Sequence, residues 1–451
     1  MATALVILAA GKGTRMKSDL PKVLHEVAGA PMLVHALRAG AALDPARTIV
    51  VAGRGADAVE AAARAWDETT EIVHQTEQLG TGHAVVQTRS ALADFDGDVI
   101  VLYGDTPFIR PQTLAAMQTA RAEHDVVVLG FEAADPGRYG RLKMSGQSLD
   151  AIVEFKDATD QERAITLCNS GVVAADAQTL FSLLDEVGND NASGEYYLTD
   201  IVSLARARGL SATAVTCDED ETRGVNSRAE LVSANAAYQA RARAELIEAG
   251  VTLQAPDTVH LCFDTLLGPD TVIEPNVVFG PGVTVENGAT IRAFSHLEGC
   301  HVARGAVVGP YARLRPGAEL SEDVRIGNFV EIKNAQIHAG TKVNHLSYIG
   351  DAELGEKTNV GAGTITCNYD GVFKHRTVIG KNVFIGSDTM LVAPVTLGDD
   401  SMTATGTVVT HDVPAGAMAV GRARQENKPG FARKMFEKLK SAKARLKKDS
   451  H

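Results

Sequence analysis

The sequence predicts an α/β domain, followed by a solenoid of parallel β-strands and a short terminal helix. Apolar, β-rich runs alternate with Ala-rich helical segments up to about Asn226, which is typical of an α/β fold with a mainly parallel sheet. After Gly250 the apolar residues recur with a period of six, which indicates a repeat architecture. The length of 451 residues also exceeds one ordinary core, so more than one domain is expected.

The first 226 residues supply the α/β pattern. Runs at 48–52, 98–103 and 125–131 are apolar and β-rich and predict strands. Residues 82–93 form an Ala-rich segment that predicts a helix. We therefore assign residues 1–226 to one α/β domain.

A single helix is expected to link this domain to the solenoid. Residues 227–249 are mostly strong helix formers, and Gly250 provides a C-terminal stop. The solenoid then occupies residues 250–424, and a basic tail occupies residues 425–451.

The period of six defines the solenoid. Its apolar markers fall in three runs, which are Ile273, Phe279, Val285, Ile291 and Leu297; Val302, Val308, Leu314, Leu320, Ile326 and Ile332; and Ile379, Ile385, Leu391 and Leu397. One inward residue every six positions fits a triangular prism with six residues per side and about ten coils. A β-sandwich would show a period of two, so the pattern disfavours it.

Three segments depart from this period. Interruptions at 338–346 and 367–378 predict projecting loops, which is where a solenoid carries its chemistry. Residues 428–448 contain nine Lys or Arg residues and apolar positions at helical spacing, namely Phe431, Met435, Leu439 and Leu446. We interpret this last segment as an amphipathic helix that packs on the solenoid end and caps it; membrane-surface binding is the alternative.

Composition disfavours several functional classes. A net charge of −12 argues against nucleic acid as the main partner, because phosphate-backbone binders usually carry a basic face. The five cysteines are scattered and form no C-x-x-C pair, so neither a zinc site nor a disulfide framework is expected. No apolar run approaches bilayer length, and no basic leader precedes the first strand. We expect a cytoplasmic protein without integral membrane association.

A glycine-containing loop after the first strand is the first candidate site. Residues 8–16 read Leu-Ala-Ala-Gly-Lys-Gly-Thr-Arg-Met, and such small residues let backbone N–H groups approach a polyphosphate. Met16 replaces the third glycine of a dinucleotide-binding motif, and no Walker P-loop is present. Arg15 and Lys22 add positive charge that can stabilise leaving phosphate groups, so both are candidate catalytic residues.

A carboxylate follows the predicted strand at 98–103. Asp105 stands at the carboxyl end of this strand, where open α/β sheets bind ligands. A carboxylate there is a natural ligand for Mg²⁺, which prefers hard oxygen atoms. A helix cap or a turn is the simpler alternative for an isolated Asp.

The string G-x-G-T-R-M at 11–16, with Pro21 and Lys22, resembles the signature of sugar-1-phosphate nucleotidyltransferases. This resemblance implies a Rossmann-like domain, with Mg²⁺ bound by Asp105 and Asn226. It also implies that segment 75–83 reads the nucleobase through Gln75, Gly80 and Thr81, and that Gly140, Glu154 and Asn169 bind the sugar. The implied nucleotide-sugar site comprises Leu8, Ala9, Ala10, Gly11, Lys22, Gln75, Gly80, Thr81, Tyr103, Gly104, Asp105, Gly140, Glu154, Asn169 and Asn226.

A histidine marks the second candidate site. His345 lies where the period of six is interrupted, so packing does not require it. A histidine in a loop can act as a general base near neutral pH. Arg315 and Lys333 precede it, and the string G-A-G-T-I-T-C-N-Y-D-G follows at 361–371. A solvated surface histidine is the alternative.

Together these motifs resemble, over essentially the whole chain, the bacterial bifunctional N-acetylglucosamine-1-phosphate uridyltransferases and glucosamine-1-phosphate N-acetyltransferases. The resemblance implies a left-handed β-helix of hexapeptide repeats, with His345 as catalytic base and the Ala362 N–H as a donor to the oxyanion. The implied sugar-phosphate site comprises Arg315, Lys333, Tyr348 and Asn359. The implied acetyl-CoA site comprises Ala362, Asn368, Tyr369, Ser387, Thr405 and Arg422. Thr405 stands where relatives often have alanine, which a backbone contact tolerates.

The resemblance also implies the reactions. The solenoid would acetylate glucosamine 1-phosphate with acetyl-CoA, and the α/β domain would then join N-acetylglucosamine 1-phosphate to UMP from UTP with Mg²⁺. The product would supply peptidoglycan and lipopolysaccharide synthesis, and a homotrimer through the β-helix would complete each acetyltransferase site. Two alternatives are a monofunctional nucleotidyltransferase with a regulatory or oligomerising solenoid, and a non-catalytic scaffold subunit. Residue chemistry alone selects neither uracil nor an N-acetylated sugar.

Overall fold

The computed structural model describes residues 2–11 and 13–448 and consists of two compact units. The first unit extends to Ala249 and also takes in residues 260–265 and 279–281. The second unit contains the other residues from Gly250 onward. Lys12 of the glycine-containing loop and residues 449–451 of the tail lie outside the described residues.

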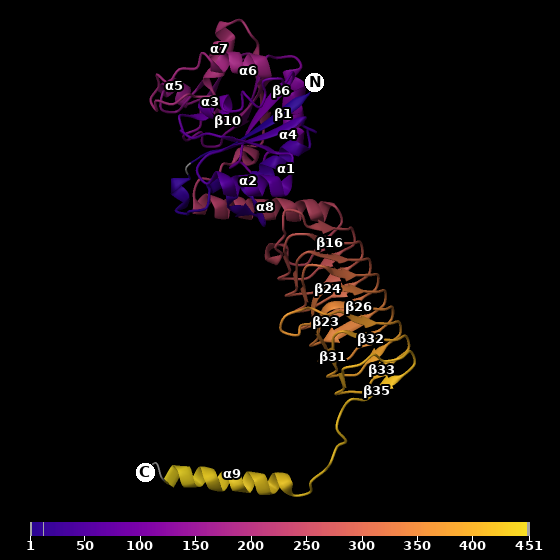
Figure 1. Ribbon diagram of the computed structural model, residues 1–451. Coiled ribbons are helices and arrows are strands. Elements are labelled where there is room, and N and C mark those ends of the chain that lie inside the picture. The colour runs from indigo at the N-terminus through magenta and orange to yellow at the C-terminus, as the bar shows by residue number, and fades with distance from the viewer. Residues whose placement is uncertain (1, 12, 449–451) are drawn as a thin grey trace. The chain divides into compact units, whose positions relative to one another are not determined.

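A mainly parallel sheet forms the centre of the first unit (Figure 1). In spatial order its strands are β11 (Ala212–Cys217), β7 (Val126–Glu132), β10 (Leu167–Asp176), β6 (Asp98–Tyr103), β1 (Thr3–Ala9), β4 (Arg47–Ala52) and β5 (Glu71–His74). A hairpin of β8 (Arg141–Ser145) and β9 (Ser148–Val153) joins beside β10. Only β10 runs antiparallel to its neighbours on this path. The predicted α/β fold is confirmed.

Helices cover both faces of this sheet, because successive strand residues point to opposite sides. Leu5 and Ile7 of β1 belong to one core, and Ala4 and Val6 belong to the other. The first core is closed by α1 (Met32–Ala41), α2 (Ala56–Trp66) and α4 (Pro111–Arg121). The second core is closed by α3 (Thr81–Val86), α6 (Ala177–Leu184) and α7 (Asp200–Ala207). A single turn, α5 (Asp160–Arg163), lies beside β8.

Two helices show how local hydrogen bonds set helix ends. α3 ends at Val86, earlier than the predicted 82–93, because the next backbone N–H groups donate three residues back, from Thr88 to Val85 O (2.9 Å) and from Arg89 to Val86 O (3.1 Å), and the chain continues as turns. α8 (Arg228–Glu248) begins at Ser227, whose hydroxyl accepts from Glu230 N (3.3 Å). α8 is part of the first unit and runs beneath α1 and α2 in Figure 1.

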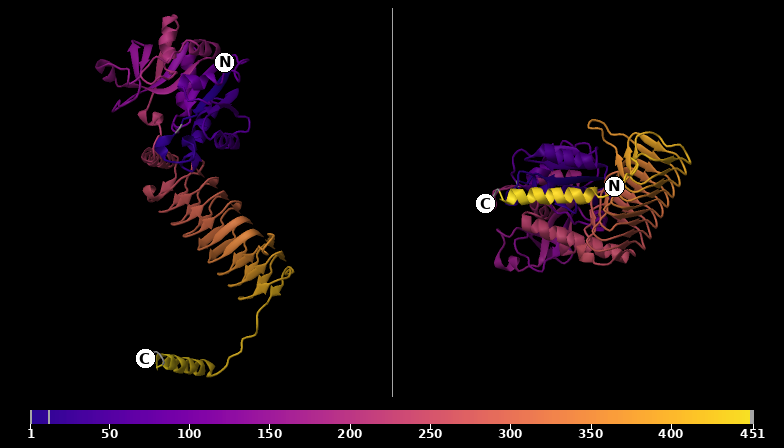
Figure 2. Two further views of the ribbon diagram at one scale, coloured as in Figure 1. Left: turned by 60° about the vertical axis from the view of Figure 1, so that its left-hand side comes forward. Right: turned by 90° about the horizontal axis from the view of Figure 1, so that it is seen from below.

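The second unit is a solenoid of short parallel strands in three rows (Figure 2). The first row consists of β12 (Thr252–Leu253), β14 (Val272–Ile273), β17 (Thr290–Ile291), β20 (Val307–Val308), β23 (Arg325–Asn328), β25 (Lys342–His345), β27 (Asn359–Val360), β30 (Phe384–Ile385), β33 (Met402–Thr403) and β35 (Met418–Ala419). The second row contains β18 (His296–Leu297), β21 (Arg313–Leu314), β24 (Glu331–Ile337), β26 (Tyr348–Leu354), β28 (Ile365–Cys367), β31 (Met390–Val392) and β34 (Val408–Val409). The third row contains β13 (Leu266–Leu267), β16 (Val283–Val285), β19 (Cys300–Val302), β22 (Ala318–Leu320), the later halves of β24 and β26, β29 (Thr377–Ile379) and β32 (Val395–Leu397).

The period-six markers fill the interior of this solenoid. Every marker from Ile273 to Leu397 is 3% exposed or less. Markers of successive coils stand in register, as Ile291, Val308 and Ile326 do along the first row. The predicted solenoid is confirmed, and its first row contains ten strands, as the expected number of coils requires.

The predicted loop at 338–346 is wrong. β24 continues to Ile337 and β25 already begins at Lys342, so the chain turns without projecting. The rhythm breaks because β24 bends at Asn334, which has φ 45, and this shortens one side of the coil. His345 is therefore the last residue of a strand.

The predicted loop at 367–378 is confirmed. After β28 the chain forms a hairpin in which Tyr369 and Lys374 form an antiparallel bridge. Val372 and Phe373 at its tip are 75% and 67% exposed. The chain rejoins the solenoid at β29.

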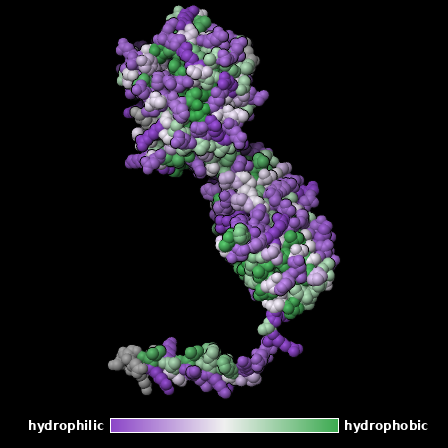
Figure 3. Space-filling view, in the orientation of Figure 1, coloured by the Kyte–Doolittle hydropathy of each residue, from purple (hydrophilic) through white to green (hydrophobic). Residues whose placement is uncertain are grey.

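The tail forms a helix, α9 (Phe431–Lys448). Its described apolar side chains lie at the surface (Figure 3), and they are Phe431, Met435, Phe436, Leu439 and Leu446. The structure therefore does not show the predicted packing of this helix on the solenoid end. Among the helices that the structure describes, none is long and apolar enough to cross a membrane.

Candidate active sites

A cavity of about 400 Å³ opens at the carboxyl ends of β1 and β6. Most residues predicted to bind the nucleotide sugar line it, namely Leu8, Ala10, Gly11, Lys22, Gln75, Gly80, Thr81, Tyr103 and Asp105. Two further predicted residues, Ala9 and Gly104, belong to the segments next to the cavity but are not part of its lining. Ala9 is buried in β1, and Gly104 N donates to Leu8 O (3.0 Å). The cavity therefore occupies the edge where open α/β sheets bind ligands.

A single ammonium group joins the two predicted metal ligands. Lys22 Nζ donates to the Asp105 carboxylate in a short contact and to Asn226 Oδ1 at 3.0 Å. The side chains of Lys22 and Asp105 are 12% and 17% exposed, so water screens this pair weakly. A backbone hydrogen bond from Val225 N to Asp105 O (3.0 Å) holds the two segments together. Two hard oxygen atoms thus converge on one cation.

This pair of oxygens suits Mg²⁺. The ion commonly binds through one or two protein oxygens and keeps waters and substrate phosphates as its other ligands. Within residues 2–11 and 13–448, no group of three or more His, Cys, Asp or Glu side chains could hold a metal ion.

The glycine-containing loop packs against Lys22, and Arg15 lies outside the cavity lining. Gly13 has φ 58, and a Cβ there would lie 2.8 Å from Lys22 Cβ. The glycine is required both for the turn and for this close approach. Arg15 lies in the 3-10 helix Thr14–Met16, is exposed and does not line the cavity. The structure brings Lys22, but not Arg15, to the predicted metal ligands.

The segment predicted to read the nucleobase forms one wall of the cavity. Gln75 Nε2 donates to Gly80 O (3.0 Å), which closes this segment on itself. Gly80 has φ 121, and a Cβ there would lie 2.5 Å from Tyr196 O. Leu198 N donates to the Thr81 hydroxyl (3.1 Å). Residues 195–198 therefore hold the wall in place.

None of the sequence motifs includes this supporting segment. Glu195 also lines the cavity, as does Gln78. The available signal was the polar and aromatic run at 193–199, which precedes α7 and has no helical or strand periodicity. Such a run between regular elements indicates a loop that can carry function.

The three predicted sugar-binding residues cluster beyond Tyr103. Asn169 N donates to Gly140 O (2.8 Å), and a Cβ on Gly140 would lie 3.4 Å from Glu154 Oε1. Burial raises the pKa of Glu154. Burial also raises the pKa of Tyr103, and the charges of Asp105 and Glu154 act in the same direction. Tyr103 therefore lies close to both the predicted metal ligand and the predicted sugar site.

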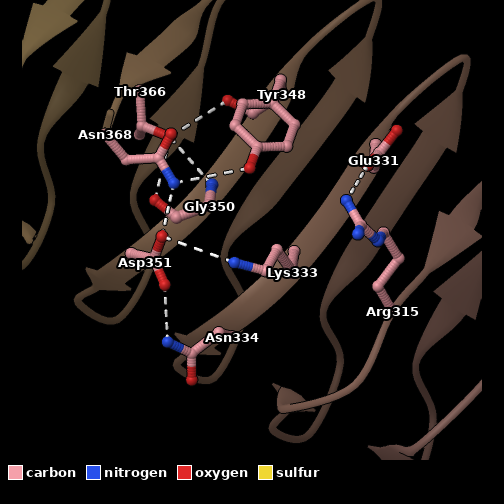
Figure 4. A network of polar contacts seen from close by, with 9 residues as sticks. All are labelled: Arg315, Glu331, Lys333, Asn334, Tyr348, Gly350, Asp351, Thr366 and Asn368. Atoms are coloured by element: carbon pink, nitrogen blue, oxygen red, sulfur yellow. Dashed lines mark hydrogen bonds and ion pairs between the residues drawn. The ribbon is translucent and has the colours of Figure 1, made fainter. Parts of the chain in front are cut away.

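A polar network in the second unit contains three residues predicted for acetyl transfer (Figure 4), namely Lys333, Tyr348 and Asn368, and a fourth, Arg315, forms a separate pair with Glu331. Asp351 is the centre of this network. It accepts from Asn334 Nδ2 (2.6 Å) and, in a short contact, from Asn368 Nδ2, and it lies 3.6 Å from Lys333 Nζ. Burial alone would raise the pKa of Asp351, but the two amide donors and the Lys333 charge lower it overall. Asp351 thus connects residues predicted for two different substrates.

Tyr348 lies beside this centre. Asn368 Nδ2 donates to the Tyr348 hydroxyl (3.4 Å). A Cβ on Gly350 would collide with that hydroxyl, so position 350 must be glycine for the ring to lie where it does. Arg315 pairs with Glu331 at 2.8 Å on the same row of strands.

His345 is oriented by an amide from the preceding coil. Its Nδ1 lies 3.1 Å from Asn328 Oδ1, and the two residues pair in register between β25 and β23. An oxygen acceptor at Nδ1 keeps the ring proton there and leaves Nε2 with a free lone pair. This is the state that a general base requires. Asn328 is not among the residues that the sequence motifs predict.

Four predicted acetyl-CoA residues continue from His345, coil by coil, along one corner of the solenoid. Successive coils are joined by hydrogen bonds from Gly363 N to His345 O (3.4 Å), Asp388 N to Ala362 O (2.7 Å) and Gly406 N to Ser387 O (2.8 Å). Arg422 Nη1 then donates to Thr405 O (2.7 Å). The row consists of Ala362, Ser387, Thr405 and Arg422.

The remaining candidates lie on other parts of the solenoid. Asn359 is on β27 of the first row, whereas Lys333 and Tyr348 are on the second row. Asn368 and Tyr369 begin the projecting hairpin, and Tyr369 is 61% exposed. One chain therefore presents the predicted acetyltransferase residues as separate groups.

Comparisons with known proteins match both units. Residues 5–170 match the MobA-like NTP transferase domain, and residues 264–299 and 376–411 match the bacterial transferase hexapeptide (six repeats). Relatives called bifunctional protein GlmU are 69% identical in Ruegeria sp. (strain TM1040), over 98% of this chain and 99% of the relative, and 71% identical in Ruegeria pomeroyi, over 100% of both. A solved UDP-glucose pyrophosphorylase complexed with UDP-glucose covers 53% of this chain and 100% of its own, at 19% identity and a TM-score of 0.44.

The fold and these matches define a transferase in which a nucleotidyltransferase domain precedes a left-handed β-helix of hexapeptide repeats. At these identities and coverages, the chain belongs to the bifunctional GlmU family. It is an enzyme with a uridyltransferase and an acetyltransferase function and serves cell-wall synthesis. The family resemblance predicted from the motifs is confirmed, and a monofunctional nucleotidyltransferase is not favoured.

Proposed function

We propose that the second unit transfers the acetyl group of acetyl-CoA to glucosamine 1-phosphate. The first unit then transfers UMP from UTP to N-acetylglucosamine 1-phosphate and releases pyrophosphate. The observation that carries the nucleotidyl-transfer half of this proposal is the convergence of Asp105 and Asn226 on the Lys22 ammonium, because it brings two oxygen ligands and a positive charge together at the carboxyl edge of a parallel sheet. The product, UDP-N-acetylglucosamine, would be made in the cytoplasm and used for peptidoglycan and lipopolysaccharide.

Nucleotidyl transfer needs positioning and charge neutralisation, but no nucleophile from the enzyme. A phosphate oxygen of the sugar 1-phosphate forms a bond to the α-phosphorus of UTP, and the bond to the pyrophosphate oxygen breaks. Asp105 and Asn226 would hold Mg²⁺, which neutralises phosphate charge. Lys22 would then direct its ammonium to a substrate phosphate. The base would be held by Gln75, Gly80 and Thr81, and the sugar by Gly140, Glu154 and Asn169.

Acetyl transfer needs a base at the attacking amine. His345 Nε2 removes a proton as the glucosamine nitrogen attacks the thioester carbonyl carbon. The C–N bond forms, the C–S bond breaks, and His345 returns the proton to the departing thiolate. The Ala362 N–H has no acceptor among the described residues and is free to donate to the oxyanion. The sugar phosphate would be held by Arg315, Lys333, Tyr348 and Asn359.

We further infer that three chains assemble through the β-helix. Phe294, Tyr311 and Phe329 stack on successive coils, with ring centroids 4.9 Å and 5.3 Å apart. They are 51%, 47% and 57% exposed, and all three have φ near 60°. Bulky residues in this conformation carry strain, and an exposed apolar row is typical of an interaction surface. Leu346, beside His345, continues the row and is 61% exposed, so a second chain seated there would reach the site.

Single-site variants test these assignments. Asp105→Ala should abolish pyrophosphate release from UTP and N-acetylglucosamine 1-phosphate but retain thiol release from acetyl-CoA. His345→Ala should do the reverse, with a loss of roughly 10²–10⁴-fold in acetyl transfer. Chelation of Mg²⁺ should stop only pyrophosphate release. If both activities survive in both variants, these residues do not perform the proposed roles.

A further inference from the structure

A second cavity lies in the first unit. It has a volume of about 720 Å³ and shares no lining residue with the nucleotide-sugar cavity. Its walls come from α1, from α8 and from the loop between β6 and α4. The side chains that give it chemical character are Arg38, Phe108, Tyr238 and Arg241.

Two arginines make one end of this cavity positive. Arg38 donates to Phe263 O (2.5 Å), and its guanidinium lies 5.7 Å from the Phe263 ring centroid. Arg241 lies 5.5 Å from the Phe108 ring centroid and 5.7 Å from that of Tyr238. Its contact with Glu245 is long, at 3.8 Å, and Glu245 is 71% exposed, so this pair is weak. Each guanidinium has five N–H donors, and most of them bind nothing in the described residues.

The other ionisable groups do not neutralise this end. Glu221 is buried and accepts from Arg110 N (3.0 Å) and the Thr113 hydroxyl (2.6 Å) at the start of α4. The Arg110 guanidinium also pairs with Glu221, at 3.8 Å. Burial lowers the pKa of His35, and the two nearby arginines, Arg38 and Arg241, lower it further. His35 therefore adds no positive charge at neutral pH, and the charge comes from the guanidinium groups.

We propose that this cavity binds a small organic phosphate with a flat apolar portion. Arg38 and Arg241 hold the phosphate, since two guanidinium groups match a dianion and bind its oxygens in pairs. Tyr238, which is half-buried, contacts the flat portion, because an aromatic wall favours such a group. Phe108 is buried and lies behind the Arg241 guanidinium. This ligand is distinct from the substrates of both reactions and occupies a separate site.

The cavity is connected to the proposed metal ligands by two short segments. Phe108 follows Asp105 in the same loop. α8, which carries Tyr238 and Arg241, begins just after Asn226, and Glu230 on its first turn accepts from Asn226 N (2.6 Å). A ligand that draws Arg241 toward Arg38 therefore pulls on both segments. Binding of the ligand should therefore change the rate of nucleotidyl transfer. This rate change rests on the proposed function, whereas the binding of the ligand to the cavity does not.

Calorimetric titration of phenyl phosphate into the full chain, saturated with UDP-N-acetylglucosamine, tests the site. Wild type should bind phenyl phosphate but not phenol. The Arg38→Gln/Arg241→Gln variant should bind phenyl phosphate more weakly, by about tenfold at least. Arg64→Gln is the matched control, because Arg64 forms an i,i+4 pair with Glu60 outside the cavity, and it should bind as wild type does. Equal affinity in the double variant and wild type, or equal binding of phenol, would overturn the proposal.

Hydrogen exchange on wild type locates the ligand without any substitution. Phenyl phosphate should slow exchange in peptides that cover residues 105–113 and 235–245. Protection elsewhere in the chain and none in these peptides would contradict the proposal. Pyrophosphate release measured with and without phenyl phosphate then tests the coupling separately, so that loss of the proposed function cannot be mistaken for loss of the binding site.

Discussion

At the residue scale, both candidate sites depend on a polar side chain that is oriented by a partner from a distant part of the chain. Lys22 meets Asp105 and Asn226, which follow it by 83 and 204 positions. His345 meets Asn328 across 17 positions, which is one coil of the solenoid. The chemistry therefore depends on the fold that brings these partners together.

Asn328→Ala tests the orientation of His345. Without the amide oxygen, the ring proton is no longer held on Nδ1, and Nε2 is less often available as a base. Acetyl transfer should fall about tenfold in kcat, which corresponds to the loss of one hydrogen bond. Thiol release from acetyl-CoA measures this effect. Pyrophosphate release from UTP is the internal control and should not change.

Asp351→Asn tests the centre of the polar network. The neutral amide attracts Lys333 less and cannot accept from both Asn334 and Asn368 as a carboxylate does. We expect a higher KM for both glucosamine 1-phosphate and acetyl-CoA, measured by thiol release. Asp323→Asn is the control, because Asp323 also has a positive φ of 57 but is exposed. A rise in KM of the same size in both variants would count against a specific role.

Asp351 also predicts a pH dependence. Its pKa is lowered in the folded chain, so it stabilises the fold above its unfolded pKa. That stabilisation is lost as the pH falls through the folded pKa, which lies below the ordinary value of 3.8. Thermal unfolding of wild type should therefore show an extra loss of stability below pH 3.8 that is smaller in Asp351→Asn. Identical acid profiles would contradict this.

The sequence indicates the residues that stand in motifs, such as Lys22 in its loop, and His345 beside the long glycine string. It does not indicate Asn328 or Asp351, because their partners lie one coil away and coils differ in length. Arg15 shows the opposite case. Its motif is intact, yet the side chain is exposed and outside the cavity lining, so its catalytic role stays a prediction.

At the element scale, the start of α8 fixes the position of a proposed metal ligand. Ser227 accepts from Glu230 N (3.3 Å), and Glu230 in turn accepts from Asn226 N (2.6 Å). The helix cap and the proposed metal site therefore share one group of residues. Caps of this kind contribute about 1 kcal/mol to helix stability.

Glu230→Ala tests this shared role. The variant loses an acceptor for Asn226 N, so the amide oxygen of Asn226 is less well placed for Mg²⁺. We expect the Mg²⁺ concentration at half-maximal pyrophosphate release to rise severalfold, with acetyl transfer unchanged. Glu248→Ala, at the other end of α8, is the control and should behave as wild type. If the thermal stability falls but the Mg²⁺ dependence does not change, Glu230 contributes only to the helix cap and not to the metal site.

Element positions were largely predictable in the solenoid and less so at element ends. The period of six places an apolar residue in the interior of each coil, and all predicted markers are buried. The interruption at 338–346 does not form the predicted loop, because a bend at Asn334 shortens one side of the coil without inserting residues. A side that is one residue shorter and a projecting loop both interrupt the period of six, so the period alone cannot distinguish them.

At the scale of the whole molecule, we infer that acetyl transfer requires more than one chain. Three sets of predicted residues lie on different parts of one solenoid, namely the row from Ala362 to Arg422, the group around Lys333, and, separately, Asn359. The exposed stack of Phe294, Tyr311 and Phe329 supplies a surface for assembly. The first unit contains its cavity and predicted metal ligands within one chain, so the two activities should respond differently to dissociation.

Tyr311→Ser/Phe329→Ser tests the assembly. Removal of two stacked rings should weaken the interface enough to shift the mass measured by light scattering toward the monomer. Acetyl transfer should fall with it, whereas pyrophosphate release should persist. Val232→Ser is the control, because Val232 is an apolar residue of α8 in the first unit and is 71% exposed. Full acetyl transfer by a monomeric variant would contradict the inference.

We infer that two separate sites in one chain act in sequence. One assay tests this inference. It supplies glucosamine 1-phosphate, acetyl-CoA, UTP and Mg²⁺ to Asp105→Ala, to His345→Ala, and to a mixture of the two, and measures UDP-N-acetylglucosamine. Neither variant alone should form the product, and the mixture should form it, because the acetylated sugar made by the first variant is consumed by the second. Product from either variant alone, or none from the mixture, would contradict the account.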